Sequence, residues 1–368
     1  MERISKKQLF IMIMYFQIGT TIIFGFSAQS GRNAWLGVLV SVGLGLLAIG
    51  IYLALMKLLP GLTLMEWYPA VLGKWFGVPI SWLYPLMFLY VSGRVLADLR
   101  DLIPTTILPS TPPYFFLGVF MCFIAYALYH GLESFGRLCE IMFPIIIGSF
   151  VVVVILLIGS DIIRLKHLFP IMEQGFGEVW TSVWPAGVTQ TFGETIVFAM
   201  FWPMVKQQGQ ISKTVVMATL SSSLLILIVD LLCITTLGEG MFAASIYPMY
   251  TVIRLISIAE FIEHLDAIAV LYFINTAFFK VAIYMLAAMY GIQRLLLMTN
   301  RRMLPIPFAA AVLFMGLTMS DSIQEHIFGV HMNILSPYFW VPLYIVAPAL
   351  LVIVALIRRW YSALLSRR

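Results

Sequence analysis

Apolar runs of about twenty residues follow one another along almost the whole chain of 368 residues. An α-helix needs about 20 apolar residues to cross the hydrocarbon core of a bilayer, where its backbone polar groups must be bonded within the protein. Runs of this length lie at about 8–27, 34–56, 80–103, 113–130, 138–158, 181–202, 212–235, 265–295, 305–320 and 339–357. The sequence therefore predicts an all-α integral membrane protein, with one transmembrane domain over residues 1–368 and about ten spans.

Charged residues are few, and their positions predict the orientation of the chain. Only 11% of the residues are charged, against about 25% in an ordinary soluble domain. With a cytoplasmic N-terminus, fifteen of the 22 lysines and arginines fall in cytoplasmic segments and four in outer segments, as the positive-inside rule requires. An even number of spans then places both termini in the cytoplasm. The net charge of +5 follows from this asymmetry and indicates no nucleic-acid partner.

Two similar hexamers fall near the middle of the first and sixth spans. Residues 19–24 read GTTIIF and residues 193–198 read GETIVF, with four identical positions. Five spans separate them, so the two halves cross the membrane in opposite directions, which is typical of a 5+5 inverted-repeat, LeuT-type transporter fold. We expect a first repeat at about 8–158 and a second at about 181–357, with spans one and six broken at Gly19 and Gly193.

Two ionisable residues lie deep in this arrangement. Glu194 follows the second glycine, and Lys280 stands near the middle of span eight. Such a charge costs at least ~2.5–3.5 kcal/mol in the bilayer centre, and this cost demands protonation, a partner or a wet cavity. Because span eight packs beside spans one and six in a 5+5 fold, a buried Glu194–Lys280 ion pair is one expectation. Alternatively, Lys280 occupies the place of a coupling cation, or either group binds a zwitterionic ligand.

Span three carries a second pair of opposite charges, Arg94 and Asp98, which lie four residues apart on one helical face. An internal ion pair is the simplest expectation for them. Tyr90 lies one turn below Arg94, and Tyr284 one turn beyond Lys280. These two tyrosines are predicted to line a small pocket against the break in span six.

Other polar residues carry weaker signals. Asp230, in span seven, serves either structure or a water path. The segment from Thr251 to His264 predicts a helix lying in the membrane interface or a lid over an outward-facing vestibule. The three cysteines lie in apolar runs without metal or disulfide spacing. No catalytic motif or cofactor-binding motif is present, and His326 and His331 share a loop without further metal ligands. The chain is therefore not expected to be an enzyme.

The sequence resembles the B subunits of bacterial spore germinant receptors over essentially its whole length. The resemblance rests on Ile4-Ser5-Lys6-Lys7-Gln8-Leu9, Gly19, the Arg94…Asp98 pair, Phe192-Gly193-Glu194 with Pro203, and above all IRLISIAEFIEHLDAIAVLYFINTAFFKVAIY at 253–284. Two departures are visible in that last stretch. His264 stands where the family favours arginine, and Tyr272 where it favours tryptophan, which puts outer-loop contacts in question.

The resemblance implies membership of the amino acid–polyamine–organocation superfamily and residence in the inner membrane of the dormant spore. It implies an A subunit and a lipoprotein C subunit as partners, and a nutrient, often an amino acid, as ligand. Carried over residue by residue, the ligand site comprises Gly19, Thr20, Tyr90, Arg94, Gly193, Glu194, Lys280 and Tyr284.

Three functions are compatible with these residues. The favoured one is a sensor whose ligand shifts a conformational equilibrium and so signals to partner subunits. The second is a secondary transporter that carries an amino acid with a proton or another cation. The third is a structural or water-conducting subunit, in which Glu194, Lys280 and Asp230 line a polar path.

Overall fold

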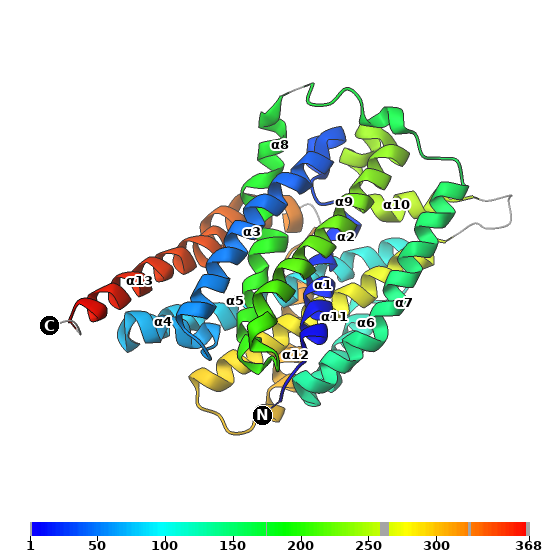
Figure 1. The fold of residues 1–368 in the computed structure, drawn as a ribbon. Helices are drawn as coiled ribbons and strands as arrows, with labels where there is room; N and C mark the ends of the chain where they lie inside the picture. The colour runs from blue at the N-terminus through cyan, green and yellow to red at the C-terminus, as the bar shows by residue number, and fades with distance from the viewer. Residues whose placement is uncertain (1, 174, 258–264, 323–324, 366–368) are drawn as a thin grey trace.

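The computed structural model describes residues 2–173, 175–257, 265–322 and 325–365, and these residues form a bundle of helices without a β-strand (Figure 1). The α-helices are α1 (Lys6–Ile18), α2 (Thr21–Phe24), α3 (Ala34–Leu58), α4 (Leu64–Leu72), α5 (Lys74–Thr106), α6 (Pro113–Tyr129), α7 (Gly131–Gly159), α8 (Phe176–Ser182), α9 (Ile211–Ala244), α10 (Pro248–Arg254), α11 (Asp266–Leu295), α12 (Pro305–Thr318) and α13 (Ala347–Leu365). The 3₁₀ or π segments are η1 (Ala28–Asn33), η2 (Leu165–Leu168), η3 (Val183–Phe192), η4 (Gly193–Met200), η5 (Trp202–Met204), η6 (Gln208–Gln210), η7 (Arg301–Met303) and η8 (Glu325–Val346).

Helices long and apolar enough to span a membrane confirm the prediction of an integral membrane protein. The described residues contain eight such segments, and α6 is a shorter apolar helix of 17 residues. The consecutive segments α8, η3 and η4 cover the predicted sixth span but change helix type along it. Together these segments correspond to the ten predicted crossings. Figure 1 shows the start of α1 and the end of α13 on the lower side, away from α8 and α10.

The first span begins at a strong local signal. Ser5 caps α1, since its Oγ accepts the Gln8 backbone N–H at 3.1 Å and the Gln8 side chain accepts the Ser5 N–H at 2.8 Å. This reciprocal pair is a capping box, which satisfies two amides that the first turn leaves free. The preceding residue, Ile4, is fully buried and pairs with the chain after span six, through Ile4 N to Met204 O at 3.0 Å and Lys206 N to Ile4 O at 2.9 Å. The start of span one is thereby tied to the end of span six.

A second cluster at the same end of the bundle involves Glu2. Its carboxylate accepts hydrogen bonds from the Tyr290 hydroxyl at 2.6 Å and the Leu132 amide at 2.9 Å, and it pairs with Arg301. These contacts join the N-terminal segment to α7, α11 and η7. The bundle is therefore closed by polar contacts on the side of the termini.

Spans one and eight form the interior of the bundle. In the span Lys6–Phe24, 78% of the most apolar window is buried, and in Ala267–Leu295 72%, against 22% in Gly131–Gly159 and in Asn333–Ser362. The outer helices therefore present most of their side chains to lipid, whereas α1 and α11 contact protein on nearly every face. Residues on these two helices are the ones positioned to form an internal site.

Two sequence expectations concern segments at the edge of the bundle. Of the segment Thr251 to His264, for which an interfacial helix was predicted, the first four residues belong to α10 (Pro248–Arg254) and residues 255–257 are not helical. Residues 258–264, which include His264, lie outside the described residues. The three cysteines are free thiols, with Cys139 and Cys233 buried and Cys122 exposed.

A comparison of two glycines on α3 tests the packing that supports span six. A Cβ on Gly45 would lie 2.4 Å from Cβ and Cγ of Phe192, whereas a Cβ on Gly43 would meet nothing within 4 Å. Gly45→Ala is therefore expected to lower the free energy of unfolding by about 1–3 kcal/mol through overpacking. The matched control, Gly43→Ala, should leave it unchanged or raise it slightly, since alanine favours helix. Thermal unfolding of the two purified variants in detergent measures the difference, and equal midpoints would contradict the predicted contact.

Candidate functional site

The first transmembrane span is interrupted at Gly19, as the sequence predicted. Helix α1 ends at Ile18, Gly19 adopts the non-helical dihedrals φ 7° and ψ −115°, and α2 resumes at Thr21. The carbonyl of Gly19 accepts a hydrogen bond from the Thr276 hydroxyl on α11 at 2.8 Å. A backbone group freed by a break inside the membrane needs such a partner. The break is thus stabilised from the neighbouring span eight.

Glycine is required at this break because Lys280 passes over it. A Cβ on residue 19 would lie 2.7 Å from Cδ of Lys280 and 2.9 Å from the carbonyl oxygen of Phe16. Real Cβ contacts are not that short, so any side chain at position 19 would displace the lysine or the backbone. The small residue and the lysine therefore form one structural unit.

The irregularity in span six takes a different form from the break predicted at Gly193. Gly193 has helical dihedrals, φ −61° and ψ −40°, and marks the change from the π-helical η3 to the 3₁₀-helical η4. The non-helical residue is Trp184, nine positions earlier, with φ −119° and ψ 130°. Glycine at 193 serves close packing, since a Cβ there would lie 3.1 Å from Cδ2 of Tyr344. Tyr52 donates its hydroxyl to the Gly193 carbonyl at 3.1 Å.

The buried ion pair expected between Glu194 and Lys280 is present. Nζ of Lys280 lies 2.9 Å from Oε2 of Glu194, and the two side chains are only 3% and 4% exposed. The ammonium also lies 5.4 Å from the centre of the Phe16 ring, within the range of a cation–π contact. Each charge offsets the cost that the other would carry alone in the membrane. The pair joins span six to span eight directly beside the break in span one.

A cavity of about 320 Å³ lies next to this pair, within the size range of small-molecule sites. It runs from Lys280 and Thr20 to residues Ala243–Ile246, at the end of α9 and just after it. Its polar lining residues are Thr20, Thr21, Ser27, Gln29, Arg94, Asp98, Ser182, Gln190, Ser245 and Lys280. The cavity therefore combines charged, hydroxyl and amide groups in the interior of a membrane protein.

The cavity contains part of the predicted ligand set. Thr20, Arg94 and Lys280 line it. Gly19, Gly193 and Glu194 are not part of the lining, and they contact Lys280 or Tyr344 as described above. The two predicted pocket tyrosines are outside its lining and pack against aromatic rings instead. Tyr90 faces Trp340, with ring centres 6.1 Å apart, and Tyr284 contacts Phe16 and Phe88 at 4.8 and 5.9 Å.

Arg94 and Asp98 do not form the expected internal ion pair. Asp98 is bonded to His326 instead, with Nε2 of the histidine 3.0 Å from Oδ1 of the aspartate and both side chains 2% exposed. Arg94 is 8% exposed, and its Nε has no hydrogen-bond partner in the part of the chain that the structure describes. Arg94 is therefore a buried arginine of the cavity lining whose Nε is unpaired among the described residues.

Asp230, which the sequence left without a role, anchors the turn that follows α2. Its Oδ1 accepts the backbone N–H of Phe26 at 3.2 Å, and the Ser27 amide also faces this carboxylate. Gly25, with φ 69°, starts the turn, and residues 25–29 form one side of the cavity. Asp230 is thus a positioning residue that fixes cavity-lining backbone from outside the cavity.

Most of the additional lining residues carry no sequence signal of their own. Ser182 and Gln190 lie on the irregular span six, and Ala243–Ile246 come from the end of α9 and the connection after it. Only Thr21 and Ser27 could have been suggested from the sequence as lining residues, because they closely follow the predicted break at Gly19. The described residues contain no group of three or more His, Cys, Asp or Glu suited to hold a metal ion.

These features define a polytopic, all-helical membrane protein with an interrupted first span, a buried ion pair and an internal polar cavity. The sequence model of the spore germination protein family matches residues 3–323, and the chain belongs to this family.

Three curated spore germination proteins align with the chain over most of their length. The chain is 28% identical to spore germination protein KB of Bacillus subtilis (strain 168) over 353 residues, which cover 96% of the chain and 94% of the relative. It is 23% identical to spore germination protein B2 of the same organism over 272 residues, 72% of each chain. It is 21% identical to spore germination protein A2 over 300 residues, 81% of the chain and 79% of the relative.

A double-mutant cycle tests the ion pair. Removing one partner leaves a buried charge unpaired, so Lys280→Met and Glu194→Gln are each expected to destabilise the protein by about 3–5 kcal/mol. The double variant should be more stable than the Lys280→Met variant, because no uncompensated charge remains. Thermal unfolding in detergent measures all four proteins. Additive losses would contradict a direct interaction between the two side chains.

Gly19→Leu tests the close approach of the lysine to the break. The new side chain would displace Lys280 from Glu194, so expression and ligand response are expected to fall together. Gly50→Leu is a matched control in the neighbouring α3, where a Cβ meets nothing within 4 Å. Normal expression and response of the Gly19→Leu variant would show that no tight contact exists at position 19.

Proposed function

We propose that this chain is the nutrient-binding transmembrane subunit of a spore germinant receptor, which senses a small molecule, such as an amino acid, at a midplane pocket. The observation that carries the proposal is the buried Arg94 in a cavity beside an interrupted helix, with an Nε that lacks a hydrogen-bond partner among the described residues. Burying a charged group without a partner is costly, so Arg94 favours an anionic group, such as a carboxylate, as occupant. Thr20 and Lys280 complete the nearby lining, and Gly19, Gly193, Glu194, Tyr90 and Tyr284 shape and support it.

The proposed architecture is the 5+5 inverted repeat, with repeats at about 8–158 and 181–357 and both termini in the cytoplasm. Three observations support it: the break at Gly19, the irregular span six, and the pairing of Ile4 with the chain that follows span six. In this orientation the cavity extends toward the outer side, from which a nutrient enters.

Signalling in this proposal follows from a difference in the ligand's affinity for two conformations of the protein. A ligand that binds one conformation more tightly shifts the population toward it by that difference in free energy and no more. The proposed receivers are an A subunit and a lipoprotein C subunit in the inner membrane of the spore. The proposal requires no catalysis and no cofactor.

A second candidate, a proton-coupled amino-acid transporter, is favoured by Asp230. This carboxylate is 1% exposed and forms no ion pair with another described residue, and its Oδ2 has no hydrogen-bond partner among those residues. Isolated carboxylates inside membranes frequently belong to proton relays. Glu194, by contrast, is already paired with Lys280.

Reconstitution of the purified protein in liposomes tests both functions with a panel of radiolabelled amino acids. The sensor proposal expects saturable binding without accumulation in the lumen. Arg94→Ala should weaken binding of carboxylate ligands by at least about tenfold, because a hydrogen bond to a charged group contributes about 1.5–3 kcal/mol. Arg254→Ala, at an exposed site on α10, is the control and should bind normally. Uptake against a gradient by the isolated protein would refute a function limited to sensing.

A further inference from the structure

Arg94 and Asp98 present opposite charges to the cavity from one face of α5. They lie four residues apart, about one helical turn, and both line the cavity while being 8% and 1% exposed. They are not paired with each other, since Asp98 is bonded to His326. Nε of Arg94 and Oδ2 of Asp98 each lack a hydrogen-bond partner in the described residues. The cavity wall thus carries a cationic and an anionic side chain, and each has one buried polar atom without a partner in the described residues.

An occupant of matching chemistry would satisfy both groups. Leaving a buried charged group without hydrogen bonds costs more than leaving a neutral one. A carboxylate complements the guanidinium, in the charge-assisted geometry that arginine favours. An ammonium group complements the free oxygen of Asp98. A molecule that carries both groups a few ångströms apart is a zwitterion.

His326 fixes the orientation of the aspartate. Its Nε2–H donates to Oδ1 of Asp98 at 3.0 Å, which leaves Oδ2 for another donor. Both side chains are 2% exposed, so water does not replace this bond easily. His326 itself touches the cavity only through Asp98 and is therefore a positioning residue.

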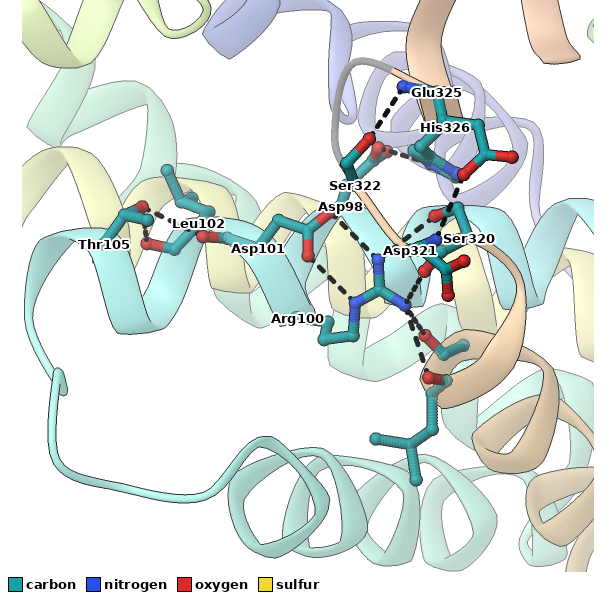
Figure 2. Close-up of polar contacts among 12 residues, drawn as sticks. Asp98, Arg100, Asp101, Leu102, Thr105, Ser320, Asp321, Ser322, Glu325 and His326 are labelled. Carbon is teal, nitrogen blue, oxygen red and sulfur yellow. Dashed lines mark hydrogen bonds and ion pairs between the residues drawn. The ribbon is translucent and has the colours of Figure 1, made fainter. Parts of the chain in front are cut away.

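The segment that carries His326 is held against α5 by Arg100. Its Nη1 donates to the carbonyls of Gly316 at 3.4 Å, Leu317 at 3.3 Å and Ser320 at 2.9 Å, at the end of α12 (Figure 2). A cation at a helix C-terminus satisfies carbonyls that the last turn leaves free. Asp101 pairs with the other side of the guanidinium, with Oδ1 at 2.9 Å from Nε. Helix α5 therefore holds both the aspartate and the segment that orients it.

Apart from His326, no residue in the described part of the chain forms an ion pair with Asp98. Lys280 is engaged by Glu194 at 2.9 Å. The Tyr247 hydroxyl, just before α10, faces Asp98 and Asp101, and burial raises the pKa of Tyr247 well above its ordinary value. Tyr247 therefore stays a neutral hydroxyl. Its oxygen also lacks a hydrogen-bond partner among the described residues.

We propose that Asp98, positioned by His326, is the ammonium-binding group of the cavity, and that together with Arg94 it selects zwitterionic amino acids over hydroxy acids of the same shape. This inference rests on the proposed function in that it takes the cavity as the ligand site. It adds the residue that discriminates between an amino group and a hydroxyl group. A site built around a charged acceptor rejects analogues that lack the matching donor, because the acceptor is then left unpaired.

The test compares matched pairs of probes on the full-length protein in liposomes. The pairs are L-alanine with L-lactate, L-valine with L-2-hydroxyisovalerate, and L-leucine with L-2-hydroxyisocaproate, and D-glucose serves as a neutral polyol. The wild-type protein is expected to bind at least one amino acid at least about tenfold more tightly than its hydroxy acid. This arm needs no substitution and so does not depend on the folding of a variant.

Four variants locate the selectivity. Asp98→Asn is expected to weaken amino-acid binding at least about tenfold and hydroxy-acid binding less than about twofold, so that the selectivity ratio collapses. Asp161→Asn, at an exposed aspartate after α7 that does not line the cavity, is the control and should keep the wild-type ratio. His326→Leu should lower the ratio toward that of Asp98→Asn, whereas His326→Gln, which keeps a donor, should restore most of it.

The outcomes separate this inference from the proposed function. A wild-type ratio in a folded Asp98→Asn variant would overturn the role of Asp98. Arg94-dependent binding of D-glucose or of the hydroxy acids, without preference for any amino acid, would overturn zwitterion selection and leave the sensor function standing. Failure of the folded wild-type protein to bind any probe would remove the proposed ligand-binding function and this inference with it. A wild-type ratio in His326→Leu would remove the positioning role of the histidine.

Discussion

The contact between Lys280 and Glu194 is the interaction on which the interior of this protein depends. A lysine and a glutamate in the bilayer core are tolerated only together, and they come from two different spans. The aliphatic part of the lysine also fills the space above Gly19, where the first span is broken. One side chain therefore connects spans one, six and eight, and the shape of the neighbouring cavity follows from their relative positions.

The sequence was informative where a physical constraint acts on a single position. The break at Gly19 and the partnership of Glu194 with Lys280 were predicted because bare charges and irregular backbone are rare and costly in a membrane. The all-helical membrane character followed from length and hydropathy alone, and the described residues contain eight helices long enough to span a membrane. The capping box at Ser5 and Gln8 explains why the family-like opening motif precedes span one.

The predictions for the break in span six and for the partner of Asp98 were wrong. In both places the structure depends on a choice between local backbone or side-chain arrangements of similar energy. Span six changes its hydrogen-bond register through π and 3₁₀ turns, in which Gly193 keeps helical dihedrals and Trp184 does not. Arg94 and Asp98 have the spacing of an ion pair, yet a histidine 228 residues away along the chain takes the aspartate. The spacing of two charged residues within one helix does not show whether a residue from another segment binds one of them instead. Residues that line the cavity from the end of a helix and the connection after it, such as Ala243–Ile246, are positioned by tertiary packing.

The closed end of the bundle bears on what the protein does after a ligand has bound. To discharge a solute on the side of the termini, the chain would first have to separate Ile4 from Val205, expose a fully buried isoleucine, and release the Glu2 carboxylate from Tyr290, Leu132 and Arg301. These losses fall on several elements at once, so they oppose a full transport cycle far more than a small movement around the cavity. The proposed sensor function needs only such a modest rearrangement, in which the solute stays on the side from which it arrived.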